Sequence, residues 1–206
     1  PDFLERYDPD SLRYYLSSSM PETSDSDFTW RDFVRRNNDE LVGTYGNLVN
    51  RVLTLIQKLE GGLIPFPSDN DEIDNELITQ INTSFEQAGK HLDECRFRQS
   101  IRTSMTLANS VNKYLEVKSP WKKQAHGIST TLWTCSLALS ALAVMTYPFL
   151  PFSAPKLFSM LGFKNNIQTH GWSLPILVPG TPIEKPTPLF KKLDDSVANE
   201  EIERMV

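Results

Sequence analysis

Cysteine and histidine are scarce in this sequence, which has two cysteines and three histidines among 206 residues. Cys95 and Cys135 lie far apart and form no C-x-x-C pair, so the spacing that a zinc site needs is absent. Both fall in stretches that we expect to be helical and apolar. Isolated thiols of this kind are typical of structural residues in a reducing cytosol. We therefore predict a cytoplasmic protein, with no metal ligands in this chain.

Catalytic motifs are also missing. The sequence has no P-loop, no G-x-G-x-x-G, no H-E-x-x-H and no G-x-S-x-G. His91, His126 and His170 have no partner pattern, so we favour surface or structural roles for them. We therefore assign no catalytic residue. The sequence starts at Pro1 and has no visible signal peptide, and we interpret it as a fragment of a longer protein.

An excess of positive charge is absent as well. The formal net charge is −5, with 21 Lys and Arg against 26 Asp and Glu. Because nonspecific binding to nucleic acid depends on phosphate neutralisation, this balance argues against it. Any contact with RNA must therefore come from a few well-placed groups. Hydrophobic residues make up 39% of the chain, which is enough for the core of one large domain or one domain with appendages.

The hydrophobic pattern predicts an all-α helical bundle, and no strand pattern is convincing. Asp8 is a candidate N-cap for a short leading helix, and Thr29 is a candidate cap for a long helix that ends near Leu59. Segment 165–188 is rich in proline and is expected to wrap irregularly over the surface. Further helices are predicted from their apolar faces over about 70–92, 93–117, 129–147, 153–161 and 194–205.

These predictions divide the chain into a connector (1–28), a helical bundle (29–163) and a C-terminal wrapping segment with a last helix (164–206). The helix predicted over 129–147 is apolar almost all round and borders on the length of a membrane span, which needs about 20 apolar residues. Its amphipathic neighbours favour a place at the centre of the bundle instead.

The long helix over 38–59 carries a polar stripe beside its apolar face. Asn47 and Arg51 are four residues apart on this stripe, so their side chains point the same way. A carboxamide beside a guanidinium offers donors and an acceptor suited to the edge of a nucleobase. On spacing alone, an ordinary solvated face is the favoured alternative. Gly43 and Gly46 each cost about 1 kcal/mol relative to alanine, which indicates close packing or close approach of a ligand.

Trp121 follows Pro120 in the run KSPWKK, where lysines on both sides make a fully apolar environment unfavourable. An exposed indole can stack on an unstacked base, a contact worth about 1–3 kcal/mol. The alternative is that the ring packs on the helix that follows. Without further information, that alternative is slightly favoured.

Three separated segments of the sequence resemble the methionyl-tRNA synthetase family. The stretch from Tyr7 to Val52 is similar to the part that follows the family's KMSKS loop and leads into its anticodon-binding helical domain. NSVNKYLEVKSPW (109–121) resembles a second signature of that domain, and KPTPLFKKLDD (185–195) resembles the closing segment of archaeal and eukaryotic members. The segments occur in the family's order, and the likeness spans nearly the whole chain.

This resemblance implies the anticodon-binding helical bundle of a class I synthetase, with methionine tRNA as partner. It implies that Asn47, Arg51 and Trp121 read the CAU anticodon. Trp121 would stack under the first base, a cytosine, and the other two would hydrogen-bond its edge. The supporting residues implied are Asn112, Pro120 and Glu116, the last of which is often Asp in bacterial relatives. Candidate phosphate contacts are Lys113, Lys118, Lys122 and Lys123, although a solvated face is favoured for each lysine taken singly.

The family's catalytic signatures, His-Ile-Gly-His and KMSKS, do not occur here, nor do its zinc-knuckle cysteines. The resemblance therefore implies no cofactor in this fragment, and assigns ATP-Mg and zinc to a catalytic domain outside the sequence. That domain would be a second partner, reached through the connector. Arg31, Arg35 and Arg36 lie near this junction, where they would contact the inner side of the tRNA or pair with neighbouring acids.

Three other functions remain open. The chain could be the anticodon domain of another class I synthetase, such as those for leucine, isoleucine, valine or cysteine. It could be a non-enzymatic bundle that binds partner helices. A membrane-associated bundle is the third, and it depends only on the apolar stretch 129–147; we predict no membrane contact.

Overall fold

The computed structural model describes residues 2–22, 27–122 and 125–204, and these ranges contain helices and no named strand. The all-α prediction is therefore confirmed. An isolated bridge joins Leu63 to Pro182. In chain order the helices are α1 (Asp2–Arg6), α2 (Pro9–Ser18), α3 (Trp30–Arg36), η1 (Asn37–Gly46), α4 (Asn47–Leu59), α5 (Glu72–Asp93), α6 (Phe97–Lys118), α7 (Ile128–Thr146), α8 (Ser153–Met160), α9 (Ile167–His170) and α10 (Val197–Arg204).

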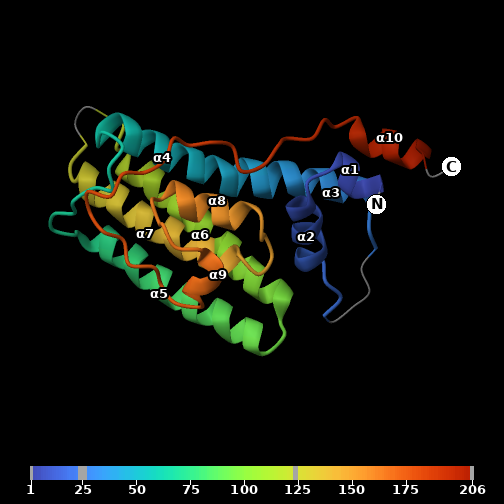
Figure 1. The fold of residues 1–206 in the computed structure, drawn as a ribbon, viewed down its shortest axis with the longest axis horizontal. Coiled ribbons are helices and arrows are strands. Elements are labelled where there is room, and N and C mark those ends of the chain that lie inside the picture. The colour runs from blue at the N-terminus through green and yellow to red at the C-terminus, as the bar shows by residue number, and fades with distance from the viewer. Residues whose placement is uncertain (1, 23–26, 123–124, 205–206) are drawn as a thin grey trace.

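Helices α5, α6 and α7 pack against one another and form the body of the bundle (Figure 1). Helix α7 is long and apolar enough to cross a membrane by length and composition, but 78% of its most apolar window is buried inside the bundle. The predicted central position of this helix is confirmed. Helix α6 also packs against α2 and η1, so it connects the bundle to the N-terminal part of the chain.

The long helix predicted over 38–59 is not one regular α-helix. The chain runs continuously from α3 through η1 to α4, but η1 is a π-helix of 10 residues. A π-helix closes its hydrogen bonds over five residues instead of four, so each residue turns through a smaller angle. The assumed period therefore holds only within α4. Leu59, the last residue of that helix, is 45% exposed although it is apolar.

Gly46 lies at the junction of η1 and α4, where the surroundings leave little room for a side chain. A Cβ atom built on Gly46 would lie 3.3 Å from Cδ2 of Phe190 and 3.0 Å from the carbonyl oxygen of Leu41. The C-terminal segment therefore packs directly on the backbone, as the close-packing prediction required. Next to it, Asn38 donates to the carbonyl of Leu193 at 2.9 Å and accepts from the Leu193 N–H at 2.9 Å.

A second, smaller core joins the two ends of the chain. Phe3 of α1 stacks on Trp30 of α3 with ring centroids 5.5 Å apart. Helix α10 packs against α3, and its buried Glu201 accepts hydrogen bonds from Arg6 at 2.9 Å and Tyr7 at 2.7 Å. The predicted last helix is confirmed with shorter bounds. Helix α1 was not predicted, because five residues carry too little periodicity to be recognised.

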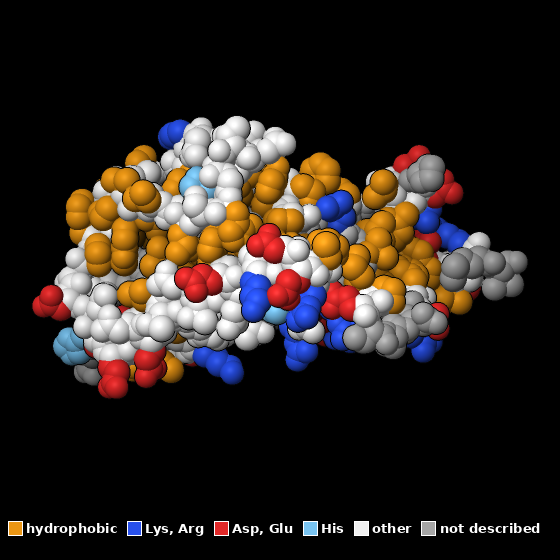
Figure 2. Space-filling view, turned by 90° about the horizontal axis from the view of Figure 1, so that it is seen from below, with side chains coloured by type: hydrophobic (Ala, Val, Ile, Leu, Met, Phe, Trp, Pro, Cys, Tyr) orange, Lys and Arg blue, Asp and Glu red, His pale blue; other side chains and the backbone are white. Residues whose placement is uncertain are grey.

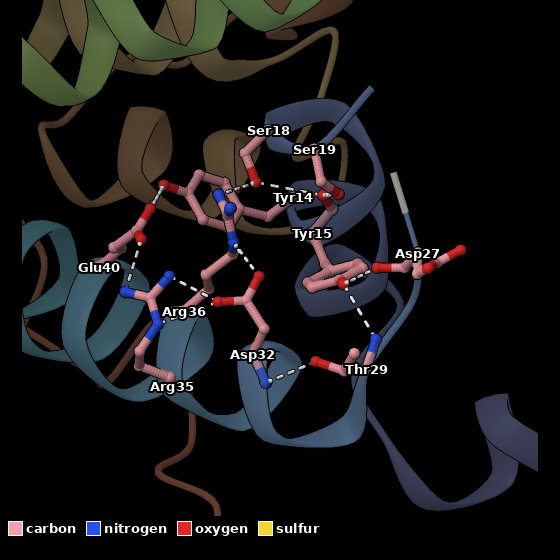
Figure 3. Close-up of polar contacts among 10 residues, drawn as sticks. All are labelled: Tyr14, Tyr15, Ser18, Ser19, Asp27, Thr29, Asp32, Arg35, Arg36 and Glu40. Atoms are coloured by element: carbon pink, nitrogen blue, oxygen red, sulfur yellow. Dashed lines mark hydrogen bonds and ion pairs between the residues drawn. The ribbon is translucent and has the colours of Figure 1, made fainter. Parts of the chain in front are cut away.

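Arginines at the junction are paired with acids (Figure 3). Asp32 accepts from Arg35 at 2.6 Å and from Arg36 at 2.8 Å, and Arg35 also lies 3.5 Å from Glu40. Partial burial alone would raise the pKa of Asp32, but the hydrogen bonds from the two arginines lower it below its usual value. The hydroxyl of Tyr14 on α2 donates to Glu40. Of the two roles considered for Arg35 and Arg36, the structure therefore displays ion pairing.

The irregular segment after α8 wraps over the bundle, as predicted (Figure 1). Its Trp172 lies against Gly89 of α5, where an added Cβ would come within 2.6 Å of the indole nitrogen. One cysteine prediction is wrong. Cys95 is exposed in the turn between α5 and α6 with φ at 57°, whereas Cys135 is buried in α7 as expected.

The end of α6 is tied to the start of α5 by a partly buried polar cluster. Asp71 and Asp74 form a capping box at the N-terminus of α5. The ammonium of Lys118 lies 2.5 Å from Asp71 and 2.6 Å from Asp74, and the hydroxyl of Tyr114 donates to Asp74 at 2.6 Å. Asp74 is only 2% exposed, so its charge depends on these partners.

We expect Asp74→Ala to lower the free energy of unfolding by about 2–4 kcal/mol, because it removes a helix cap and leaves Lys118 with one carboxylate. Urea denaturation of the purified chain measures this loss. Asp69→Ala is the control, because Asp69 is an exposed residue of the preceding loop. Equal midpoints for the two variants would contradict a stabilising role for the cluster.

The same cluster predicts a pH dependence. The hydrogen bond from Lys118 holds the pKa of Asp71 below its ordinary value of 3.8. A carboxyl with a lowered folded-state pKa stabilises the fold above 3.8, and this contribution is lost as the pH falls through the lowered value. We expect Lys118→Met to move the pKa of Asp71 upward, as followed by carboxyl-carbon NMR. An unchanged titration in that variant would show that the ion pair does not form in solution.

Candidate nucleic-acid interface

Arg51 on α4 reaches toward α6, where it contacts two of the predicted residues at once. Its Nη2 atom lies 2.6 Å from Oε1 of Glu116 on α6. Its Cζ atom lies 5.3 Å from the ring centroid of Trp121, within the range of a cation–π contact. The guanidinium is thus held between a carboxylate and an indole, with its side chain 30% exposed.

Trp121 is held at the surface by a tight turn. Helix α6 ends at Lys118, and its C-cap Ser119 adopts a left-handed conformation with φ at 44°. The N–H of Lys122 donates to the Ser119 carbonyl at 3.0 Å. Pro120 is buried beneath this turn, whereas Trp121 is 42% exposed. The indole is therefore neither part of the apolar core nor far from Arg51. Its cation–π partner belongs to α4.

Asn47 is the first residue of α4 and is exposed. It precedes Arg51 by one helical turn, so both side chains project from the same side of the helix. Asn112 supports this surface from α6: its amide donates to the carbonyl of Thr44 in η1 at 3.3 Å and to that of Ala108 at 3.3 Å. The structure therefore brings Arg51, Glu116 and Trp121 together, and Asn47 lies one helical turn before Arg51 on the same helix.

The candidate lysines fall into different environments. Lys113 and Lys122 are exposed and lie on either side of Trp121 in the sequence. Lys118 has a side chain only 10% exposed, and Asp71 and Asp74 hold its ammonium. In this conformation Lys118 is not free for a phosphate. Lys123 lies outside the described residues.

Two residues, Glu116 and Lys118, have charged partners that the sequence did not predict. Glu116 was expected to support the surface indirectly, but it contacts Arg51 itself. Lys118 was counted with the exposed lysines, although Asp71 and Asp74 open the preceding helix, α5, at a spacing that favours a capping box. The spacing of the two aspartates is visible in the sequence, but their position beside the end of α6 is known only from the fold.

Metal-binding clusters are not found in the part of the chain that the structure describes: no group of three or more His, Cys, Asp or Glu side chains could hold an ion. The described residues therefore do not fit the zinc that the family resemblance implies for its catalytic part. The polar groups that are brought together suit recognition of a planar, polar ligand: an exposed indole face, a guanidinium with five N–H donors and a carboxamide.

Comparison with protein families gives two matches. Residues 64–205 match the family model described as the anticodon binding domain of methionyl tRNA ligase. Residues 1–53 match the family model described as tRNA synthetases class I (M). Both agree with the resemblance drawn from the sequence. The second match ends within α4, just after Arg51.

Curated relatives and solved structures agree with these matches. The methionine–tRNA ligase of Dehalococcoides mccartyi strain 195 is 46% identical over 99% of this chain, and that of Chloroflexus aggregans is 39% identical over 99%. The chain spans 37% and 39% of their lengths. These relatives do not support the archaeal and eukaryotic character that we expected of the segment 185–195.

Two solved structures of Mycobacterium tuberculosis methionyl-tRNA synthetase share the fold with a TM-score of 0.86. The apo form is 25% identical and is matched over 94% of this chain and 40% of its own. The form bound by methionyl-adenylate is 26% identical, over 92% and 39%. From the fold, the family matches and these relatives together, the chain belongs to the methionyl-tRNA ligase family, and it carries the family's anticodon-binding domain.

Proposed function

We propose that this chain selects methionine tRNA by reading its CAU anticodon through Asn47, Arg51 and Trp121. The observation that carries the proposal is the position of Arg51, whose guanidinium lies over the exposed indole of Trp121 and one helical turn after the exposed Asn47. A base that stacked on this indole would present its polar edge to the two side chains of α4.

Discrimination in this proposal arises from unpaired polar groups. A cytosine edge would pair with the donors and acceptor of Arg51 and Asn47, and a wrong base would leave some of them without a partner. Each such loss costs about 1–3 kcal/mol when the group is removed from water. Glu116 orients Arg51 in the absence of RNA, and Asn112 and Pro120 hold the surfaces that carry the groups.

The remaining parts of the proposal concern the longer protein. Aminoacylation would be performed by a catalytic domain that uses ATP-Mg and carries zinc, in the cytoplasm, and residues 1–28 would connect it to the bundle. Helix α2 is suited to this role because Tyr14 bonds Glu40 of η1 and α2 packs against α6. Lys113 and Lys122 would contact phosphates beside the anticodon.

We expect Trp121→Ala to weaken binding of an RNA hairpin with a CAU loop by about 5- to 100-fold, because it removes one base-stacking platform. Trp121→Phe retains an aromatic plane and should lose less. Fluorescence anisotropy with the labelled hairpin measures both. Phe152→Ala is the control, since Phe152 is also an exposed aromatic residue, at 55%. Equal effects of Trp121→Ala and Phe152→Ala would exclude the stacking role.

Arg51→Lys tests the polar edge separately, because it keeps the charge but removes the planar fork of donors. We expect the preference for a CAU hairpin over one with the first base changed to uracil to fall by about 10-fold or more. Asn47→Ala should reduce the preference in the same way. A variant that binds both hairpins more weakly by the same factor would show that these groups do not read the base. Equal binding of both hairpins by the unaltered chain would favour a bundle that does not read RNA.

A further inference from the structure

The outer face of α6 carries a line of exposed polar residues, of which the proposed function uses only Lys113. Arg102, Thr106, Asn109 and Lys113 are all exposed, and their spacing of three or four residues places them on one side of the helix. At a rise of about 1.5 Å per residue, Arg102 and Lys113 lie about 16 Å apart along the axis. We refer to these four residues as the α6 stripe.

The α6 stripe continues directly from the candidate interface. Lys113 lies one turn before Glu116, the residue that contacts Arg51, and the stripe then runs toward the N-terminal end of α6, away from Trp121. A ligand seated on the indole and extending along the bundle in that direction would pass over it. The stripe is therefore an extension of that surface.

Charge distinguishes α6 from its neighbour α5. Helix α6 has four basic residues and one acidic residue, whereas α5 has one lysine and five acidic residues. Among the described residues, no carboxylate lies within ion-pair distance of Arg102 or Lys113, while Lys118 and Glu116 are paired elsewhere. Figure 2 views the α5 side and displays acidic and basic side chains intermixed. The stripe of α6 thus offers two basic side chains to a polyanion, although the chain as a whole is negative.

A polar groove lies beside the stripe. It has a volume of about 460 Å³ between α5 and α6, and its α6 wall is made by Gln99, Arg102, Thr103 and Thr106. The lining consists mainly of hydroxyl and amide groups, which can pair with ribose hydroxyls. Double-stranded RNA is recognised in this manner, through phosphates and 2′-OH groups across its shallow minor groove and without reading of sequence.

We propose that the α6 stripe binds the phosphate backbone of an RNA double helix, the stem that closes the anticodon loop, with Arg102 and Lys113 contacting separate phosphates. This proposal rests on the proposed function for the placement of the loop. It also predicts an effect on affinity that can be measured separately from the preference for one anticodon. The stripe supplies affinity for any stem, whereas Asn47, Arg51 and Trp121 supply the preference for one loop.

The test measures the dissociation constant of the whole chain for a CAU hairpin, for the same hairpin with an altered anticodon, and for a single-stranded heptanucleotide with the loop sequence, over a range of KCl concentrations. Arg102→Ala and Lys113→Ala should each weaken binding of both hairpins by about 3- to 10-fold at low salt. Each should reduce the slope of log K against log salt by about 1, and the double variant by about 2. The ratio between the two hairpins should stay unchanged in both variants, and the affinity for the heptanucleotide should stay unchanged in Arg102→Ala.

Arg102→Lys should restore the slope because it restores the charge. Lys164→Ala is the matched control, since it removes one exposed charge in the loop after α8 and should leave the slope unaltered. Slopes that are the same in the stripe variants as in the unaltered chain, or that fall equally in the control, would overturn the proposal. If the unaltered chain failed to distinguish the hairpins while the stripe variants still lost slope, the anticodon assignment would fail and the stem-binding assignment would stand.

Discussion

The contact between Lys118 and the two aspartates at the start of α5 fixes where α6 ends, and the position of Trp121 depends on that end. Ser119 leaves the helix in a left-handed conformation directly after Lys118, and the indole follows two residues later. On the η1 side, the amide of Asn112 on α6 donates to the carbonyl of Thr44, and this bond links α6 to the helical segment that leads into α4 and Arg51. These two polar contacts therefore help to position Arg51 and Trp121, although neither contact involves those two residues.

Much of the fold could be predicted because the spacing of apolar residues in an amphipathic helix indicates which side of the helix is buried. The apolar pattern located α4, α5, α6 and α7, and the capping residues Asp8 and Thr29 marked helix starts that the structure retains. The π-helical segment could not be predicted, since a change in the number of residues per turn depends on how the rod packs. Helix α1 is stabilised by Phe3 and Tyr7 on Trp30, a contact made only after folding.

The candidate site was predictable only in part. Spacing placed Asn47 and Arg51 on one side of a helix, but on spacing alone a solvated face was favoured, and the resemblance to a family was needed to connect them with Trp121. The charged partners of Arg51 and Lys118 could not be predicted because they lie far away in the sequence. Arg51 and Glu116 are 65 residues apart, and Lys118 and Asp71 are 47 apart. Charge neighbours of this kind decide which basic residues are available to a ligand, and they come only from the fold.

The pairing of α1 with α10 has a consequence for how the chain can be joined to other parts. Glu201 of α10 accepts hydrogen bonds from Arg6 and Tyr7, so the first and last helices share one pole of the molecule, while the C-terminal end of α6 lies at the opposite pole (Figure 1). Any polypeptide attached at either extremity would emerge from that shared pole. The distal tip, with its indole, would stay unobstructed and could reach a ligand held at a distance.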